Sequence, residues 1–324
     1  MTVCGDISPS KMGVALASES LVRDQSGAEA DAVSHYDMES AFRAILPELM
    51  QLKQLGGGTV IDTVSVYAGR NVKFLQRLSR ASELNVLTNT GYDGTEGNKY
   101  VPIELQKESA EDIAFRWIKE GWYGIGEAKI RPGFIKIGVD GGGLSSFHAK
   151  LFQASALAHF QTGLPVMVDC MDFLSLSEGM SLLRKAGLSA EGLIWSCSAM
   201  PEEEDLLSYL YQGGWFCLKG IKQTGVNLWV KLLCFLKEKG FLGRVLVSPG
   251  QDWIVNGTFS TKGEKSGLSL NQPYRIFFNS LLEALSEVDF SRADIRTLTE
   301  KNPRKAFEVG VRRAGKQRKK YFLF

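Results

Sequence analysis

Short apolar runs alternate along this chain with longer segments in which apolar residues recur every three or four positions. The short runs predict buried strands, and the longer segments predict helices with one apolar face. We expect eight strands, at residues 12–17, 59–61, 85–88, 134–139, 165–168, 193–195, 215–218 and 245–247. Helical patterns follow them at residues 38–55, 72–84, 110–120, 145–161, 174–186, 205–212, 227–239, 273–285 and 302–307.

Eight strands that alternate with helices indicate parallel pairing, because a parallel connection needs a long crossover segment. The fold class that this pattern predicts is α/β, as a (β/α)₈ TIM barrel. No linker is evident, so we expect residues 1–324 to form a single domain that ends in a basic tail. Pro47 falls inside the first helical pattern and is expected to kink or split that helix.

The functional site of a TIM barrel is built where the strands end, at the C-terminal face of the ring. Polar and charged residues stand at most of these ends, with a thiol at one of them. They are Ser18, Glu19, Ser20, Asp62, Asn89, Lys136, Asp169, Cys197, Lys219 and residues 248–252.

Lys136 interrupts the apolar strand FIKIGV, residues 134–139. A lysine in a buried strand is costly unless its charge is paired or its pKa falls. The acid that we expect to pair with Lys136 is Asp169, at the end of the next strand.

The composition is that of an ordinary globular protein, with 324 residues, 44% hydrophobic and 23% charged. A net charge of +2 gives no indication of a nucleic-acid partner. No apolar run approaches the length of about 18 residues typical of a membrane span, and the N-terminus lacks a signal-peptide pattern. Five cysteines without a CxxC pair are typical of reduced thiols in the cytoplasm. The basic run at residues 312–320 is interpreted as a solvated tail.

Several stretches together resemble one known family. They are GDISPSKMGVALASESL (residues 5–21), GGGTVIDT (56–63), GRNVKFLQRLS (69–79), RPGFIKIG (131–138), TGLPVMVDC (162–170) and NPRKAF (302–307). The chain resembles the phosphotriesterase-like members of the amidohydrolase superfamily. The resemblance implies a TIM barrel, metal-dependent hydrolysis of phosphate esters, lactones or related esters, and a possible homodimer.

The resemblance also implies two divalent metals. Their ligands are a His-x-His pair after strand one, a carbamylated lysine on strand four, a histidine after each of strands five and six, and an aspartate after strand eight. Only the lysine has a clear counterpart, because the four histidine positions hold other residues and the aspartate position falls on Gly250 or Asp252. The lysine is Lys136, and the four histidine positions hold Ser18, Ser20, Asp169 and Cys197.

The three histidines of the chain do not fill these positions. His35 lies in a polar stretch, and His148 and His159 lie on one predicted outer helix. We interpret them as surface or packing residues, since the helices of this fold surround the barrel.

Two hypotheses follow for the function. The first is a hydrolase scaffold with a degenerate metal centre and no cofactor, inactive or altered, that binds a small polar molecule at the barrel mouth. Its candidate catalytic residues are Lys136, Asp169 and Asp252, and its candidate ligand-binding residues are Ser18, Ser20, Lys136, Asp169, Cys197 and Lys219. The second is an active hydrolase with zinc or another divalent metal at Asp169, Cys197 and Asp252. A purely structural barrel is a third class.

Three further features have two interpretations each. Lys219 is either a solvated lysine at the rim or, with Lys136, part of a site for a carboxylate or phosphate. The turn at residues 140–146, DGGGLSS, is either a tight connection or an anion site at a helix N-terminus. Cys197 is a packing residue or a vestigial ligand position rather than a nucleophile, because no histidine is placed to activate it.

Overall fold

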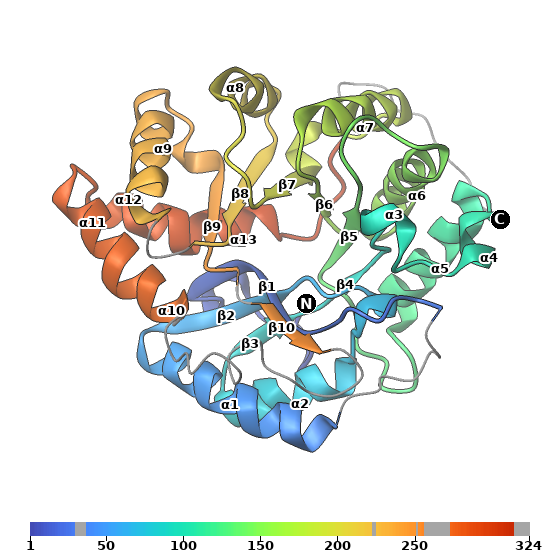
Figure 1. Cartoon of the computed structure of the whole chain (residues 1–324), viewed down its shortest axis with the longest axis horizontal. Helices are drawn as coiled ribbons and strands as arrows, with labels where there is room; N and C mark the ends of the chain where they lie inside the picture. The colour runs from blue at the N-terminus through green and yellow to red at the C-terminus, as the bar shows by residue number, and fades with distance from the viewer. Residues whose placement is uncertain (30–36, 222–224, 251, 256–272, 314–324) are drawn as a thin grey trace.

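The computed structural model describes residues 1–29, 37–221, 225–250, 252–255 and 273–313. In this part of the chain a ring of strands is surrounded by helices (Figure 1). The strands are β1 (Val14–Asp24), β2 (Gly57–Asp62), β3 (Asn85–Leu87), β4 (Asn89–Thr90), β5 (Phe134–Gly138), β6 (Val166–Asp169), β7 (Leu193–Cys197), β8 (Trp215–Lys219), β9 (Val245–Ser248) and β10 (Asp252–Val255).

All the paired strands of the ring run parallel, in the orders β10-β1-β2-β3 and β4-β5-β6-β7-β8-β9. The first boundary between the two sheets is a single residue, Thr88, which separates β3 from β4. At the second boundary, the backbone N–H of Ser18 in β1 donates to the Ser248 hydroxyl of β9, at 2.9 Å. The eight expected strands are therefore present, with β3 and β4 together forming the third. The predicted α/β class and TIM-barrel architecture are confirmed.

The longer helices are α1 (Met38–Gln54), α2 (Val72–Ser82), α5 (Ala110–Tyr123), α6 (Ser146–Thr162), α7 (Phe173–Ala186), α8 (Glu203–Tyr211) and α9 (Val226–Glu238). The shorter ones are α3 (Thr95–Asn98), α4 (Ile103–Gln106), α10 (Pro273–Arg275), α11 (Leu282–Glu287), α12 (Arg292–Arg296) and α13 (Asn302–Ala306). Two π-helical segments, Ile276–Leu281 and Thr297–Lys301, join α10 to α11 and α12 to α13.

Helix α1 continues through Pro47 as one element, so of the two expected outcomes, a kink or a split, the structure excludes the split. Proline removes one helical hydrogen bond at this point. Buried apolar side chains on both sides of it, including Ile45 and Leu49, hold the helix against the sheet. Tertiary packing therefore outweighs the local preference.

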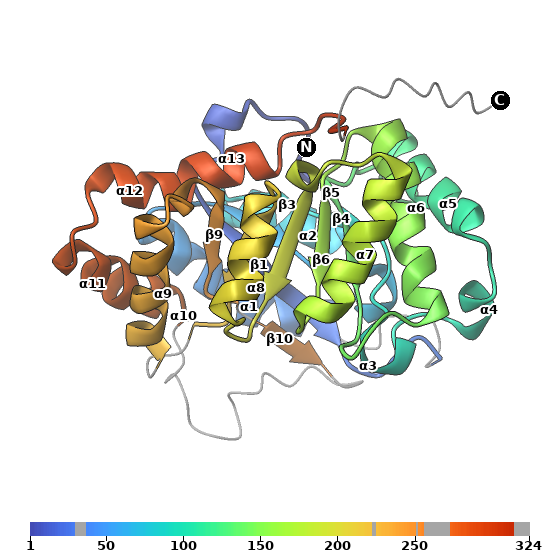
Figure 2. The same cartoon turned by 90° about the horizontal axis from the view of Figure 1, so that it is seen from above.

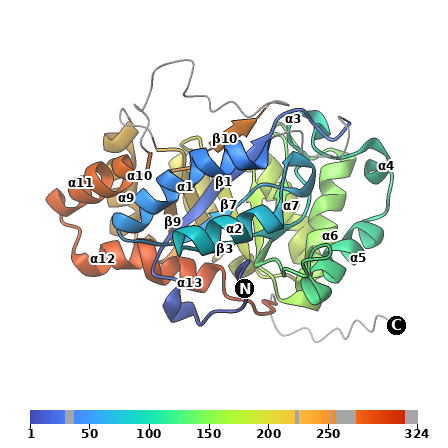
Figure 3. The same ribbon diagram turned by 90° about the horizontal axis from the view of Figure 1, so that it is seen from below.

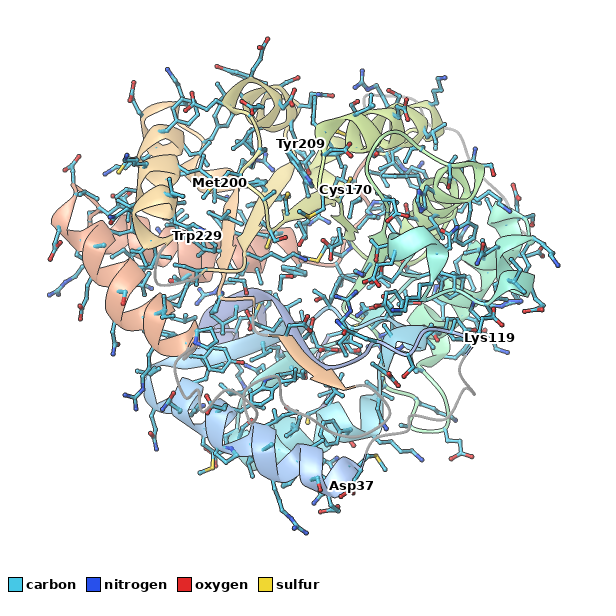
Figure 4. The ribbon with its side chains drawn as sticks, viewed as in Figure 1. Asp37, Lys119, Cys170, Met200, Tyr209 and Trp229 are labelled. Carbon is cyan, nitrogen blue, oxygen red and sulfur yellow. The ribbon has the colours of Figure 1, made fainter. Side chains whose placement is uncertain are left out.

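The side chains of the ring alternate between two apolar layers, as successive residues of a strand must. Outward side chains such as Val60, Ile135 and Trp195 join the larger layer, between strands and helices. Figure 4 shows Cys170 inside the helix ring, whereas Asp37 and Lys119 point away from the molecule. Inward side chains form a separate layer at Ala17, Ile61, Leu87, Phe134, Met167, Ile194, Trp215, Cys217 and Leu246.

Helix α13 closes one end of the ring. Its neighbour Phe307 packs edge-on against Phe134, with ring centroids 5.4 Å apart. The side-chain amide of Asn302 donates to the carbonyls of Leu242 and Val245, at 2.7 Å each. Figures 2 and 3 show α13 and β10 at opposite ends of the barrel, so the mouth lies at the end marked by β10.

Strand β1 is longer than predicted. The expected strand ended at residue 17 and a polar loop followed, but β1 continues to Asp24. The reason is β10, a parallel partner that the sequence pattern did not predict, which pairs Ser20 with Asp252 and Asp24 with Val255. A second strand satisfies the backbone of a polar segment that would otherwise turn to solvent.

His35, residue 251 and residues 314–324 of the basic tail lie outside the described residues. In the described part of the chain, no helix combines the length and the apolar character that a bilayer crossing requires. The single-domain organisation stays a prediction.

Candidate functional site

A polar cavity of about 210 Å³ opens at the C-terminal ends of the strands. Most of the residues nominated from the sequence meet there. Those that line the cavity are Ser18, Ser20, Lys136, Asp169, Lys219, Gly250 and Asp252.

Lys136 projects from β5 into the bottom of this cavity, where its side chain is 3% exposed. Its ammonium donates to Asp93 Oδ2 at 2.5 Å. The other oxygen of Asp93 accepts from the backbone and the hydroxyl of Thr95, at 3.2 and 2.6 Å. Burial alone would raise the pKa of Asp93, but the charge and hydrogen bond of Lys136 hold that pKa well below its usual range. Asp93 is therefore a charged partner of Lys136.

The prediction that Lys136 pairs with Asp169 was wrong. Asp93 belongs to the loop after β4, and this loop folds over the end of β5: the N–H of Gly138 donates to the Tyr92 carbonyl, and the N–H of Gly94 to the Gly138 carbonyl. The resulting backbone pairing places Asp93 next to Lys136, so the Lys136 ammonium bonds to Asp93 instead of Asp169.

Gly91 makes this approach possible. A Cβ atom at residue 91 would lie 2.0 Å from the backbone oxygen of Lys136, and the φ angle of Gly91 is +119°. Both observations require glycine, since other residues rarely adopt such a φ and have no room for a side chain here.

Asp169 forms a second ion pair, with Lys219. The Lys219 ammonium lies 2.8 Å from each carboxylate oxygen of Asp169. Burial lowers the pKa of Lys219, but the charge and hydrogen bonds of Asp169 outweigh burial, so the pKa is raised overall. Lys219 is thus neither a freely solvated lysine nor an unpaired charge.

Arg23 and Asp252 form the rim of the cavity where β1 pairs with β10. Their closest charged atoms are 3.9 Å apart, and Arg23 also lies 3.3 Å from Glu96. The guanidinium stacks over the ring of Tyr100, with 5.0 Å to the centroid. Arg23 sits in the segment that the sequence pattern assigned to a loop, which is why it was missed.

Ser18 and Ser20 line the cavity from β1, while Glu19, between them, is buried. The Glu19 carboxylate accepts from the Ser248 hydroxyl and from the Gly250 N–H. Glu19 therefore fixes the end of β9 against β1.

Asp62 and Asn89 are buried but do not line the cavity. One Asp62 oxygen accepts from the Leu21 N–H at 2.9 Å, and the other has no hydrogen-bond partner among the described residues. Asn89 donates to the carbonyls of Asp62 and Val64, at 3.1 and 2.9 Å. Both residues therefore stabilise the backbone at the strand ends and do not face the cavity.

Cys197 also stands apart from the cavity. It belongs to the layer between strands and helices, and the neighbouring Ser198 lines the cavity in its place. Burial raises the pKa of the Cys197 thiol, so the thiol stays protonated. The geometry agrees with a packing role for this cysteine.

The other sequence features resolve as structural. The buried ring of His148 bonds to the Gly94 carbonyl, and that of His159 bonds to the Leu164 carbonyl and the Arg312 N–H, so both are packing residues. In the turn at residues 140–146, amides that were candidates for anion binding donate instead to side chains of the α7 region. The pairs are Gly142 to Asp172, Gly143 to Ser175 and Leu144 to Glu178. The contacts agree with the first of the two interpretations, in which this turn is a tight connection.

The sequence reasoning missed Asp93, Arg23, Ser65 and Ser198 as members of the site. Asp93 had a usable signal, because it is an acid shortly after the predicted third strand. Ser65 and Ser198 lie in loops without such a signal.

Comparison with known proteins places this geometry in a family. The model of the phosphotriesterase family matches residues 1–307. The chain belongs to the phosphotriesterase family. A phosphotriesterase homology protein of Escherichia coli (strain K12) is 25% identical over 301 residues, which is 91% of this chain and 98% of that protein.

Other phosphotriesterase-family relatives carry more specific names. An aryldialkylphosphatase of Saccharolobus solfataricus is 21% identical over 84% of this chain and 87% of its own. An N-acetyltaurine hydrolase of Danio rerio is 24% identical over 66% of each chain.

The phosphotriesterase family implies a pair of divalent metals at the barrel mouth, and the side chains here do not fit such a pair. Lys136 is held by Asp93, and both Asp169 oxygens are occupied by Lys219. Among the described residues, no three His, Cys, Asp or Glu side chains come together as a metal-binding group. This includes Asp169, Cys197 and Asp252, so the alternative of a rebuilt metal centre gains no support.

Proposed function

We propose that this phosphotriesterase-family barrel has a degenerate metal centre and binds a small polar molecule at its mouth, without phosphotriesterase-type metal-dependent hydrolysis. The observation that supports it is that Lys136 and Asp169, which stand where the family resemblance implies metal ligands, are engaged in ion pairs. Their partners are Asp93 and Lys219.

The physical argument concerns charge. A carbamylated lysine is an anionic metal ligand, whereas we propose that Lys136 is unmodified and that its ammonium pairs with Asp93. A divalent cation bound nearby would be repelled by this ammonium and by that of Lys219. It would also have to displace Lys219 from Asp169, leaving a partly buried ammonium without its counter-ion.

The cavity remains suited to a ligand. Its polar wall is made by Ser18, Ser20 and Ser65 and by the two ion pairs. Two relatives, the aryldialkylphosphatase and the N-acetyltaurine hydrolase, are named for small-molecule substrates. We propose that the ligand here is likewise a small molecule, with Ser18, Ser20, Lys136, Asp169 and Lys219 as contacts and Asp252 at the rim.

Elemental analysis tests the degenerate centre. Protein expressed without chelators in medium supplemented with zinc, iron and manganese is expected to retain well under one equivalent of any of them after dialysis. One or more equivalents per chain would contradict the proposal and support the alternative, an active hydrolase with a rebuilt metal site.

A matched variant sharpens this test. Lys219→Met removes the ammonium that occupies Asp169 without adding a metal ligand. Calorimetric titration with zinc is expected to show at most weak binding to the parent and a gain in affinity in the variant. An unchanged, tight affinity in both proteins would show that Lys219 does not oppose a metal here.

Location in the cytoplasm and assembly as a homodimer stay predictions.

A further inference from the structure

The two ion pairs of the mouth differ in their access to the cavity. The side chains of Lys136 and Asp93 are 3% and 7% exposed, whereas those of Lys219 and Asp169 are 17% and 25% exposed. Lys219 and Asp169 therefore present a positive and a negative group side by side to anything that enters. Their charged atoms are 2.8 Å apart.

The charges around the cavity are balanced as well. In its described wall, the three cations Arg23, Lys136 and Lys219 are matched by the three acids Asp93, Asp169 and Asp252. A ligand with only a positive or only a negative charge meets a repulsive group next to each attractive one. A ligand that carries both signs meets an attractive partner for each.

The wall also has hydrogen-bonding capacity to spare. A lysine ammonium has three donors, and among the described residues Asp93 is the hydrogen-bond partner of Lys136. Ser65 lines the cavity and is 1% exposed, and its buried hydroxyl has no hydrogen-bond partner in the described structure. A buried hydroxyl without a partner is costly, so a ligand toward which the Ser65 hydroxyl can turn would be favoured.

The apolar part of the wall is small. In the described lining, the apolar side chains are those of Val64 and Ala68. A ligand with a long hydrocarbon chain would find little apolar surface to cover, so the occupant is small and polar.

We propose that the mouth binds a small zwitterion of the amino-acid type, with its carboxylate at Lys219 and its ammonium at Asp169. The inference rests on the proposed function and narrows its ligand to one class. A carboxylate and an ammonium two or three carbons apart match the spacing of adjacent opposite charges in the wall.

Four compounds of similar size test the charge requirement: β-alanine, propionate, propylamine and propionamide. Isothermal titration calorimetry at pH 7 and low salt is expected to give β-alanine an affinity at least about tenfold above each of the others. Propionate, propylamine or propionamide binding as tightly would overturn the zwitterion while leaving a polar-ligand site intact. Absence of binding by all four compounds would overturn both the zwitterion proposal and the polar-ligand site.

Two substitutions test which residue contacts which end. Lys219→Gln leaves the negative Asp169, so the preference is expected to move from β-alanine to propylamine. Asp169→Asn leaves the positive Lys219, so the preference is expected to move to propionate. These opposite shifts are not the result of a purely structural ion pair, whose loss would lower stability without reversing selectivity.

The matched control is Lys237→Gln. Lys237 forms ion pairs with Asp289 and Asp294, away from the mouth. Its substitution is expected to leave the affinities for all four compounds unchanged. Circular dichroism of each variant establishes that it is folded before its affinities are compared. Folded Lys219→Gln and Asp169→Asn variants with the parental order of affinities would refute the assignment.

Discussion

At the residue scale, Asp62 is a fully buried carboxyl at the end of β2. Burial raises its pKa to about 7, because its effect is larger than that of the hydrogen bond from the Leu21 N–H, which lowers the pKa. In the folded protein the carboxyl therefore holds its proton to higher pH than in the unfolded chain. The folded state binds more protons between about pH 4 and 7, so its free energy of unfolding falls as the pH rises through that window.

Substituting Asp62→Asn removes this titration and keeps an acceptor for the Leu21 N–H. The variant and the parent are expected to be similarly stable near pH 4. Above pH 7 the variant should be more stable, by up to about 4 kcal/mol, since each pKa unit corresponds to about 1.4 kcal/mol. Urea denaturation at several pH values measures the difference. A difference that stays constant with pH would show that Asp62 does not titrate in this range.

The ion pair of Lys136 shows how far the contacts of a single residue can be predicted from sequence. An apolar strand with one lysine predicts a paired charge, and the structure contains that pair. The identity of the partner was wrong because it depends on how a loop folds. Asp93 reaches Lys136 through backbone contacts of the loop with Gly138, and no periodicity in the sequence encodes them.

At the scale of elements, the turn between β5 and α6 is held by the start of α7. The Asp172 carboxylate caps α7 by accepting from the Ser175 N–H at 2.8 Å, and it accepts from the Gly142 N–H at 2.7 Å. One side chain thus joins two successive strand-to-helix connections.

Asp172→Ala is expected to lower the free energy of unfolding by about 1–2 kcal/mol, because it removes a helix cap and leaves a turn amide without its partner. Asp172→Asn keeps one carbonyl acceptor and should cost less than the alanine variant. Chemical denaturation of both proteins measures the order. Equal losses in the two variants would mean that the carboxylate charge, rather than the hydrogen bonds, stabilises this turn.

Most elements were predictable because their apolar positions repeat with the period of a strand or a helix. The C-terminal part of β1, residues 18–24, was not predictable, since it is mainly polar and its strand conformation depends on pairing with β10. At Pro47 the opposite error would have been to end the helix, because the local signal allowed a split and packing keeps the helix continuous. Both cases depend on contacts between segments distant in sequence.

At the scale of the whole molecule, the two ends of the barrel have different chemistry. The mouth holds charges and hydroxyls, whereas the opposite end is closed by Ala306 and Phe307 against the inward apolar layer. The apolar residues that stabilise the barrel and the polar residues that can contact a ligand therefore lie at opposite ends of the barrel axis.

Phe307→Ala should lower the free energy of unfolding by about 3 kcal/mol, as removing a buried aromatic ring leaves a cavity. Affinity for a ligand at the mouth is expected to stay within twofold of the parent. Leu228→Ala, at a position 57% exposed, is the control and should change stability by less than about 0.5 kcal/mol. A large loss of affinity in a folded Phe307→Ala protein would show that the two ends are coupled.

Gly91 has a consequence for how this site diverges in evolution. With a Cβ only 2.0 Å from the Lys136 oxygen, any other residue at position 91 lifts the loop off β5 and takes Asp93 with it. We therefore expect Gly91 and Asp93 to change together. A lineage that changes position 91 must supply the buried lysine with a different counter-ion, or lose the lysine as well.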